Sequence, residues 1–181
     1  MNHRKRAVFL DRDGVLNDTF VRDGTSYPPG KVDQVRILPG VTEAVLLLKQ
    51  LGLMRIVVTN QPDVARGTQT AAEVHAINKM LGEKIALDEF RVCMHDTADN
   101  CSCRKPKPGM LLAAAAEHDI DLNASFMVGD RSGDILAGAA AGCRTFLVGR
   151  PYSKAGDCRP DFTVQDLADA ARIIAGLVKG S

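Results

Sequence analysis

The chain has 181 residues, 45% of them hydrophobic, a size that supports one substantial core but not two. Its 23 Lys and Arg residues nearly balance its 22 Asp and Glu residues, so overall charge gives no reason to expect a nucleic-acid or membrane partner. No stretch approaches the roughly 20 apolar residues that span a bilayer, and the N-terminus lacks the pattern of a signal peptide. We therefore expect one cytoplasmic domain over residues 1–181, and favour a monomer.

Short runs rich in Val, Ile and Phe alternate along the chain with segments of helical periodicity. The sequence predicts strands, in chain order, over residues 7–11, 54–60, 90–95, 125–130, 144–149 and 161–164. It predicts helices over residues 40–51, 71–86, 108–119, 133–141 and 166–178, and Thr70 and Glu73 have the spacing of a capping box. This alternation is typical of an α/β fold, in which a parallel sheet has helices on both faces.

Acidic residues stand where two of these strands end. Asp11 and Asp13 follow the first strand, and Asp130 and Asp134 follow the fourth. Ligands of open parallel sheets bind at the carboxyl ends of the strands, because the loops converge there. Carboxylates gathered at that edge would repel one another without a cation, and oxygen ligands from separate loops suit Mg²⁺. We therefore predict a magnesium site that contains Asp11, Asp13 and Asp130 and accepts a phosphorylated substrate.

An aspartate-rich turn is a weak signal by itself, because Asp and Gly are common in ordinary turns. The combination of four segments is more specific: DRDGVLN, VVTNQ, CRKPKPGM and VGDRSGD occur in this order. On these motifs, residues 7–150 resemble the haloacid dehalogenase superfamily of aspartate-nucleophile phosphatases. The resemblance implies a three-layer, Rossmann-like parallel sheet.

The resemblance also implies roles for the matching residues. Asp11 would attack phosphorus and become an aspartyl-phosphate, while Asp13 would protonate the leaving oxygen and later activate water. Thr59 and Lys105 would stabilise the transferring phosphoryl group. The remaining matches imply substrate binding by Asn60, Arg104 and Arg131, and support of the magnesium site by Asp134.

A cysteine-rich loop, CMHDTADNCSC, covers residues 93–103. Cys93, His95, Cys101 and Cys103 supply three thiolates and one imidazole, a set that suits tetrahedral Zn²⁺. Four protein ligands leave no open position, so the predicted zinc site is structural. The alternative is a surface loop whose cysteines are free. Because Cys103 directly precedes the predicted cations, bound zinc would hold them beside the phosphate site.

Zinc-loop members of the superfamily include heptose bisphosphate phosphatases and histidinol phosphate phosphatases, and KPGM at residues 107–110 is more similar to the former. This resemblance implies hydrolysis of the sugar bisphosphate D-glycero-D-manno-heptose 1,7-bisphosphate at position 7, on the way to lipopolysaccharide or other activated heptoses. Histidinol phosphate is the alternative substrate. An inactive zinc module that only binds phosphate is the alternative from another class.

Two further features bear on specificity. Pro62 and Asp63 stand where the heptose enzymes typically have Ser-Gly, which places an additional anion near the expected pocket. No long insertion follows the first or second strand, so the chain has no room for a large cap domain. Residues 14–39 should form a small flap over an open site, which favours a compact phosphosugar.

Overall fold

A computed structural model of the chain describes residues 4–153 and 158–180. Parallel strands form a six-stranded sheet in the order β5-β4-β1-β6-β7-β8. In chain order these strands are β1 (Ala7–Leu10), β4 (Met54–Asn60), β5 (Glu89–Cys93), β6 (Phe126–Gly129), β7 (Arg144–Val148) and β8 (Phe162–Val164). The predicted α/β fold with a parallel sheet is confirmed.

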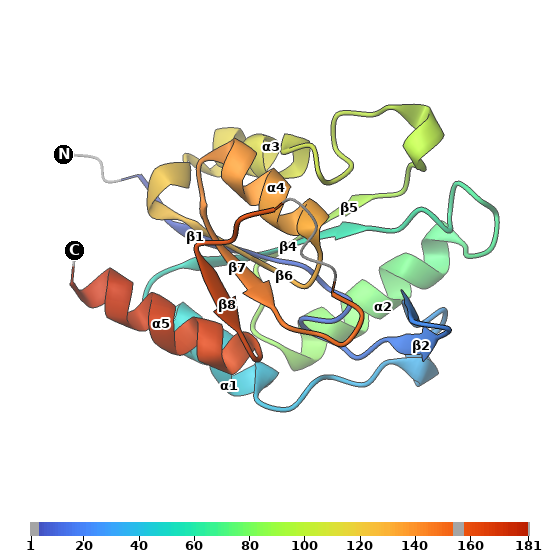
Figure 1. Cartoon of the computed structure of the whole chain (residues 1–181), viewed down its shortest axis with the longest axis horizontal. Helices are drawn as coiled ribbons and strands as arrows, with labels where there is room; N and C mark the ends of the chain where they lie inside the picture. Colours follow the sequence, from blue (N-terminus) through green and yellow to red (C-terminus); the bar gives the residue numbers. More distant parts are fainter. Residues whose placement is uncertain (1–3, 154–157, 181) are drawn as a thin grey trace.

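Helices cover both faces of the sheet, so the molecule has three layers (Figure 1). One face carries α1 (Val41–Gln50), α2 (Ala71–Lys84) and α5 (Leu167–Lys179), and the other carries α3 (Gly109–His118) and α4 (Ser132–Ala141). Successive side chains of a strand point to opposite faces, and both faces are buried here, which explains the unbroken hydrophobic run of β1. Each predicted strand and helix is present, with ends shifted by at most two residues.

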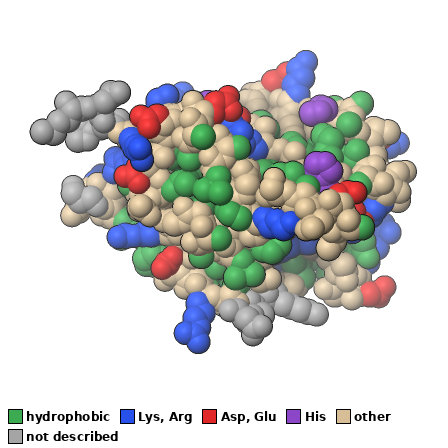
Figure 2. Space-filling view, turned by 90° about the horizontal axis from the view of Figure 1, so that it is seen from above, with side chains coloured by type: hydrophobic (Ala, Val, Ile, Leu, Met, Phe, Trp, Pro, Cys, Tyr) green, Lys and Arg blue, Asp and Glu red, His purple; other side chains and the backbone are tan. Residues whose placement is uncertain are grey.

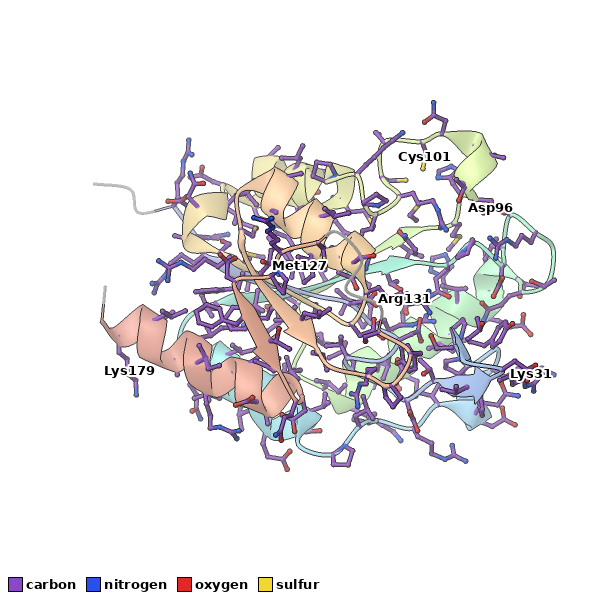
Figure 3. The ribbon with its side chains drawn as sticks, viewed as in Figure 1. Lys31, Asp96, Cys101, Met127, Arg131 and Lys179 are labelled. Carbon is purple, nitrogen blue, oxygen red and sulfur yellow. The ribbon has the colours of Figure 1, made fainter. Side chains whose placement is uncertain are left out.

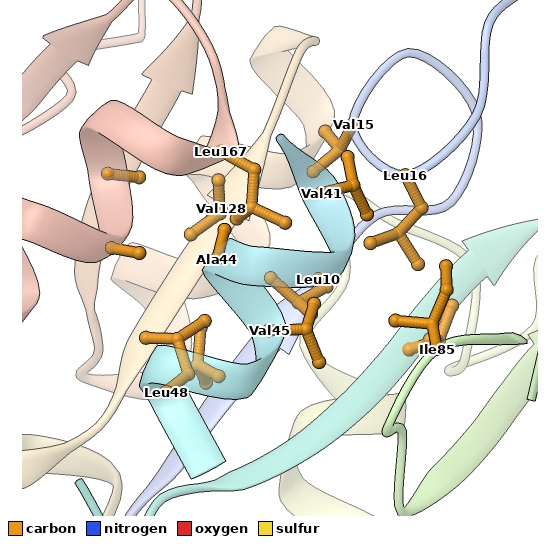
Figure 4. Close-up of a cluster of buried hydrophobic side chains, with 14 of the residues drawn as sticks. Leu10, Val15, Leu16, Val41, Ala44, Val45, Leu48, Ile85, Val128 and Leu167 are labelled. Carbon is orange, nitrogen blue, oxygen red and sulfur yellow. The ribbon is translucent and has the colours of Figure 1, made fainter. Parts of the chain in front are cut away.

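The larger core cluster fixes the end of β1 from which the acidic loop begins. Helix α1 buries residues at three- and four-residue spacing, namely Val41, Ala44, Val45 and Leu48. They belong to the same buried cluster as Leu10 of β1 and Leu167 of α5 (Figure 4). The packing of these α1 side chains against Leu10 holds the last residue of β1 in place, and Asp11 follows Leu10 directly.

The connections at the carboxyl end of the sheet are short. Between β1 and α1, the flap contains an antiparallel hairpin of β2 (Phe20–Arg22) and β3 (Thr25–Tyr27), followed by the 3₁₀ turn η1 (Val32–Gln34). Two further 3₁₀ turns are η2 (Thr97–Asp99), in the cysteine-rich loop, and η3 (Leu122–Ala124). The described connections contain no large cap domain. The flap and the cysteine-rich loop both lie at this end of the sheet (Figure 1).

The predicted capping box is confirmed. The side chains of Thr70 and Glu73 form the capping box at the start of α2, with Glu73 N donating to Thr70 Oγ1 and Thr70 N donating to Glu73 Oε2. Within the described part of the chain, every helix is too short or too polar to cross a bilayer.

On the face formed by α3 and α4, side chains of both charges are interspersed with hydrophobic ones (Figure 2).

Gly138 allows α4 to lie close to the sheet. A Cβ atom at this position would stand 2.6 Å from Cβ of Met127 and 3.0 Å from Cγ2 of Thr145. Although alanine is the better helix former, we expect Gly138→Ala to lower the free energy of unfolding by about 1–3 kcal/mol. Urea denaturation measures this change.

Gly176 on α5 provides the matched control, because a Cβ atom there would meet nothing within 4 Å. Gly176→Ala should raise the free energy of unfolding by about 0.5–1 kcal/mol, the ordinary benefit of alanine in a helix. The same sign of change in both variants would contradict the close approach of α4.

Candidate active site

The carboxyl ends of the central strands open into a cavity of about 400 Å³, within the usual size range of small-molecule sites. Most of the predicted site residues line it: Asp11, Asp13, Thr59, Asn60, Arg104, Lys105, Arg131 and Asp134. Thr25, Ser26 and Tyr27 of the flap hairpin line it as well. The parallel sheet therefore brings together residues from the four motifs, and the flap contributes a wall of the cavity.

Three buried carboxylates form the floor of the site. Oxygen atoms of Asp11, Asp130 and Asp134 all lie within 4.8 Å of one another. Burial raises the pKa of Asp11 to about 6, and it raises the pKa of Asp130 to about 8, with the neighbouring carboxylates adding to both shifts. Both oxygens of Asp130 are buried, and the Tyr152 hydroxyl is a hydrogen-bonding neighbour of this carboxylate. Three closely spaced, buried carboxylates fit a divalent cation, which binds oxygen ligands and would favour the charged form of Asp11 and Asp130.

The sequence predicts Asp13 as a ligand and Asp134 as an outer support, and this ligand set stays a prediction. In the structure, the carboxylate that lies within 4.8 Å of those of Asp11 and Asp130 is that of Asp134. The Asp13 carboxylate instead accepts hydrogen bonds from Asn17 Nδ2 at 2.9 Å and Gln61 Nε2 at 2.8 Å. The chain bends after β1, so residues that follow one another there do not keep the alternation of a strand. Asp13 still lines the cavity, beside the cluster rather than within it.

Lys105 lies in the middle of this acidic floor. Its Nζ donates to Asp11 Oδ1 at 2.8 Å and to the Val58 carbonyl at 2.7 Å, and it forms an ion pair with Asp134. Burial alone would lower the pKa of Lys105, but the two carboxylates outweigh it and raise the pKa above its ordinary value. The predicted cation is therefore charged and next to the predicted nucleophile.

Asn60 and Thr59 end β4 beside this lysine. The Asn60 side chain, predicted to bind substrate, donates to the Lys105 carbonyl at 3.0 Å and accepts from the Lys105 amide at 3.1 Å. Both ends of this amide are thus engaged by the backbone that carries Lys105. The Thr59 hydroxyl is buried and accepts a hydrogen bond from Gln61 Nε2 at 2.9 Å. Asn60 thus holds the backbone of Lys105, and both Asn60 and Thr59 line the cavity.

Two arginines stand at the mouth of the cavity. Arg104 Nη1 donates to the His95 carbonyl at 3.2 Å, which ties it to the cysteine-rich loop. Arg131 Nη2 donates to Ser26 Oγ at 2.7 Å, so it links the loop after β6 to the flap. Figure 3 shows Arg131 at this edge of the sheet, between the flap and the cysteine-rich loop that carries Asp96 and Cys101. Both arginines are placed to meet an anionic group that enters from solvent.

The four predicted zinc ligands converge. Cys103 Sγ lies 3.2 Å from Cys93 Sγ, 3.4 Å from Cys101 Sγ and 3.3 Å from His95 Nδ1. Cys93 Sγ lies 3.7 Å from both Cys101 Sγ and His95 Nδ1. Metal–ligand distances of about 2.0–2.3 Å would place tetrahedral zinc ligands about 3.3–3.8 Å apart, so the donor set fits this metal. Burial and the neighbouring thiols raise the pKa of Cys93 to about 12, a shift that a bound dication would reverse.

The additional anion, Asp63, is paired. Arg66 Nη1 lies 3.4 Å from Asp63 Oδ1, and Arg66 Nε donates to Asp96 Oδ2 at 2.7 Å. Hydrogen bonds from Arg66 lower the pKa of Asp96 to about 2. The loop after β4 is thus joined to the cysteine-rich loop by an exposed ion-pair network, and Asp63 does not face the cavity as an uncompensated charge.

Sequence reasoning missed the residues that surround Asp13. Gln61 stands two positions after Thr59, so strand periodicity could have placed the two side chains together. Arg12 donates to Asp13 from the neighbouring position, and no local pattern indicates this contact. Gly14, with φ of 91°, allows the turn, and a Cβ atom there would stand 2.1 Å from Asp130 Oδ2. The glycine in the motif is therefore required by the close packing of the acidic floor.

Comparisons with known proteins agree with this geometry. Residues 102–170 match a family model described as HAD-hydrolase-like. A solved D,D-heptose 1,7-bisphosphate phosphatase from B. bronchiseptica, complexed with magnesium and phosphate, superposes with a TM-score of 0.81 at 32% identity and covers 97% of this chain and 99% of its own.

Two curated relatives extend the similarity over nearly the whole chain. D-glycero-beta-D-manno-heptose-1,7-bisphosphate 7-phosphatase of Pasteurella multocida is 37% identical over 96% of this chain and 98% of its own length. The protein of the same name from Yersinia pestis is 34% identical, with 96% and 97% covered. The chain therefore belongs to the haloacid dehalogenase-like hydrolases and, within them, to the phosphatase family of these two relatives.

Proposed function

We propose that the chain removes the 7-phosphate of D-glycero-β-D-manno-heptose 1,7-bisphosphate through an aspartyl-phosphate on Asp11. The observation that carries this proposal is the position of Asp11, between the ammonium of Lys105 and a cluster of buried carboxylates, on the floor of an open cavity. The similarity to heptose bisphosphate phosphatases over nearly the full chain supports this substrate.

The first step would be an in-line attack. Lys105 engages Asp11 Oδ1, so the proposed attack uses Oδ2. As the new O–P bond forms, the bond from phosphorus to the sugar oxygen breaks, and protonated Asp13 would give its proton to that oxygen. Lys105 and the Thr59 hydroxyl would stabilise the negative charge of the phosphoryl oxygens. Because Lys105 is already buried and paired, it needs no large rearrangement to do so.

The second step would return the enzyme to its starting state. Asp13, now a carboxylate, would accept a proton from a water molecule that attacks phosphorus, and the Asp11–phosphorus bond would break to release inorganic phosphate. Asp11, Asp130 and Asp134 would hold Mg²⁺, which when bound supplies positive charge to the phosphoryl oxygens and to the carboxylates. Arg104 and Arg131 at the mouth would contact the remainder of the substrate.

The cysteine-rich loop would hold Zn²⁺ through Cys93, His95, Cys101 and Cys103. A closed set of four ligands supplies a structural crosslink rather than a reactive position. This crosslink would end one residue before Arg104 and two before Lys105, so it would limit the motion of both cations. The distances between the three sulfur atoms and the histidine nitrogen support this assignment.

Replacement of the nucleophile tests the mechanism. Asp11→Asn should reduce phosphate release by at least about 10³-fold, because the amide cannot form the intermediate. Phosphate release is measured at saturating Mg²⁺, with circular dichroism and zinc content as checks of the fold. Asp166→Asn, at the N-cap of α5, is the control and should retain full activity, since asparagine caps a helix as well as aspartate does. Turnover by Asp11→Asn at the unaltered rate would exclude Asp11 as nucleophile.

Loss of one zinc ligand tests the second site. Cys103→Ser should reduce zinc affinity by more than about 10–100-fold and lower kcat/KM by at least about 10-fold, because Arg104 and Lys105 lose their fixed position. Metal analysis of the purified protein and steady-state kinetics measure these effects. Cys143→Ser is the matched control, because Cys143 is buried outside the cluster. Equal zinc content in the two variants would refute the assigned ligand.

A substrate panel tests specificity. We expect kcat/KM for D-glycero-β-D-manno-heptose 1,7-bisphosphate to exceed that for histidinol phosphate by at least about 10²-fold, since the two arginines at the mouth have an anionic group to bind only in the former. Analysis of the product by phosphorus NMR would show which phosphate is removed. Preference for histidinol phosphate would overturn the proposed substrate without affecting the assigned chemistry.

A further inference from the structure

Arg12 is the largest of the fully buried side chains in the described structure. In the sequence it stands between Asp11 and Asp13. A buried guanidinium without partners would be strongly destabilising, so its partners indicate what the position requires. Arg12 Nε lies 3.1 Å from Asp13 Oδ2, and Nη2 donates to the same oxygen at 2.9 Å. Nε also lies 3.2 Å from Asp13 Oδ1. The guanidinium therefore spans the Asp13 carboxylate with one planar edge.

The other side of the guanidinium is anchored on a helix. Arg12 Nη1 donates to Asn78 Oδ1 of α2 at 3.0 Å, across 66 positions of the sequence. Asn78 is 5% exposed, and its Nδ2 is buried without a partner among the described residues. The amide thus leaves a donor unsatisfied while its oxygen faces Arg12. This arrangement indicates that the contact with Arg12 determines the orientation of Asn78.

Two more donors complete the support of Asp13. Asn17 Nδ2 engages Oδ1, and Gln61 Nε2 engages Oδ2. Together with Arg12 they hold both carboxylate oxygens from three directions, so the carboxylate has little freedom to rotate. Asp13 is 8% exposed, and its exposed part lines the cavity that contains Asp11. The orientation of this side chain is therefore determined by its supports rather than by solvent.

We propose that Arg12, anchored by Asn78, is a positioning residue that aims the Asp13 carboxyl group at the leaving oxygen of the substrate. This inference rests on the proposed role of Asp13 in proton transfer. A fork with a planar edge can fix the plane of a carboxylate, whereas a lysine ammonium at the same place supplies charge without that geometry. Loss of this positioning would weaken the transfer of the proton to the leaving oxygen, while Asp11 would keep its place.

A purely structural role for Arg12 would have a different signature. If the arginine only joined the loop after β1 to α2, its loss would slow the reaction of every substrate to the same extent. A positioning role predicts a loss that depends on the leaving group. Phenol has a pKa of about 10, like tyrosine, and needs a proton as it departs, whereas the more acidic p-nitrophenol departs readily as an anion.

The test compares kcat/KM for phenyl phosphate and p-nitrophenyl phosphate in Arg12→Lys, because this parameter reports the step in which the leaving group departs. We expect a loss of at least about 10-fold for phenyl phosphate and less than about 3-fold for p-nitrophenyl phosphate. Equal losses for the two substrates, or no loss for either, would overturn the proposal. Both probes are independent of the sugar. If the wild-type chain cleaves them and leaves the heptose bisphosphate intact, only the proposed substrate is wrong.

Two further variants complete the experiment. Arg55→Lys alters another buried arginine, which is paired with Asp88 at 2.7 Å outside the cavity, and it should change neither rate. Asn78→Ala removes the anchor and keeps Arg12, and alanine is well tolerated in a helix. It should show the same dependence on the leaving group, with about a 3-fold loss for phenyl phosphate. If Arg12→Lys does not fold, equal losses or no loss in Asn78→Ala overturns the proposal.

Discussion

The site depends on an excess of negative charge that is buried at the carboxyl end of the sheet. Three carboxylates are buried within 4.8 Å of one another, and the ammonium of Lys105 contacts two of them. The three carboxylates and the ammonium together carry a net charge of −2, which one divalent cation would neutralise. Burial and the neighbouring carboxylates raise the pKa of Asp11 and Asp130, whereas a bound dication would lower both. The floor of the cavity is therefore built for a dication and for the phosphate oxygens that accompany it.

The contacts around Lys105 hold its positive charge in a fixed place beside Asp11. Lys105 is held at its backbone by Asn60, at its ammonium by the Val58 carbonyl, and at its N-terminal side by the cysteine-rich loop. A charge stabiliser that is already in place does not have to be reorganised during the reaction. The four-atom sulfur and nitrogen cluster lies outside the cavity, yet it adjoins the two cations in sequence. Its contribution to catalysis would thus be mechanical, through the position of the loop.

Asp11 and Asp13 illustrate how two carboxylates of one motif acquire different tasks. Asp11 faces the cluster of acids and the lysine, whereas Asp13 faces hydrogen-bond donors, including a guanidinium. The bend after β1 and the glycine at position 14 separate the two environments within a few residues. In the proposed mechanism, the first environment would leave one oxygen of Asp11 for attack on phosphorus, and the second would hold the carboxyl group of Asp13 in place for proton transfer. This division depends on contacts with β4 and α2, far away in the sequence.

The sequence by itself determined the order and type of the elements, because the periodicity of buried residues is a local property. It also determined which residues reach the site, because parallel strands end at one edge, and it predicted that Cys93, His95, Cys101 and Cys103 of one short loop come together. The tertiary structure alone decided that Asp134 rather than Asp13 completes the acidic cluster, that Asn60 holds Lys105, and that Arg12 reaches Asn78. Side-chain directions in a bent loop have no fixed period. They are set by partners from other elements, which pack against the loop only when the chain has folded.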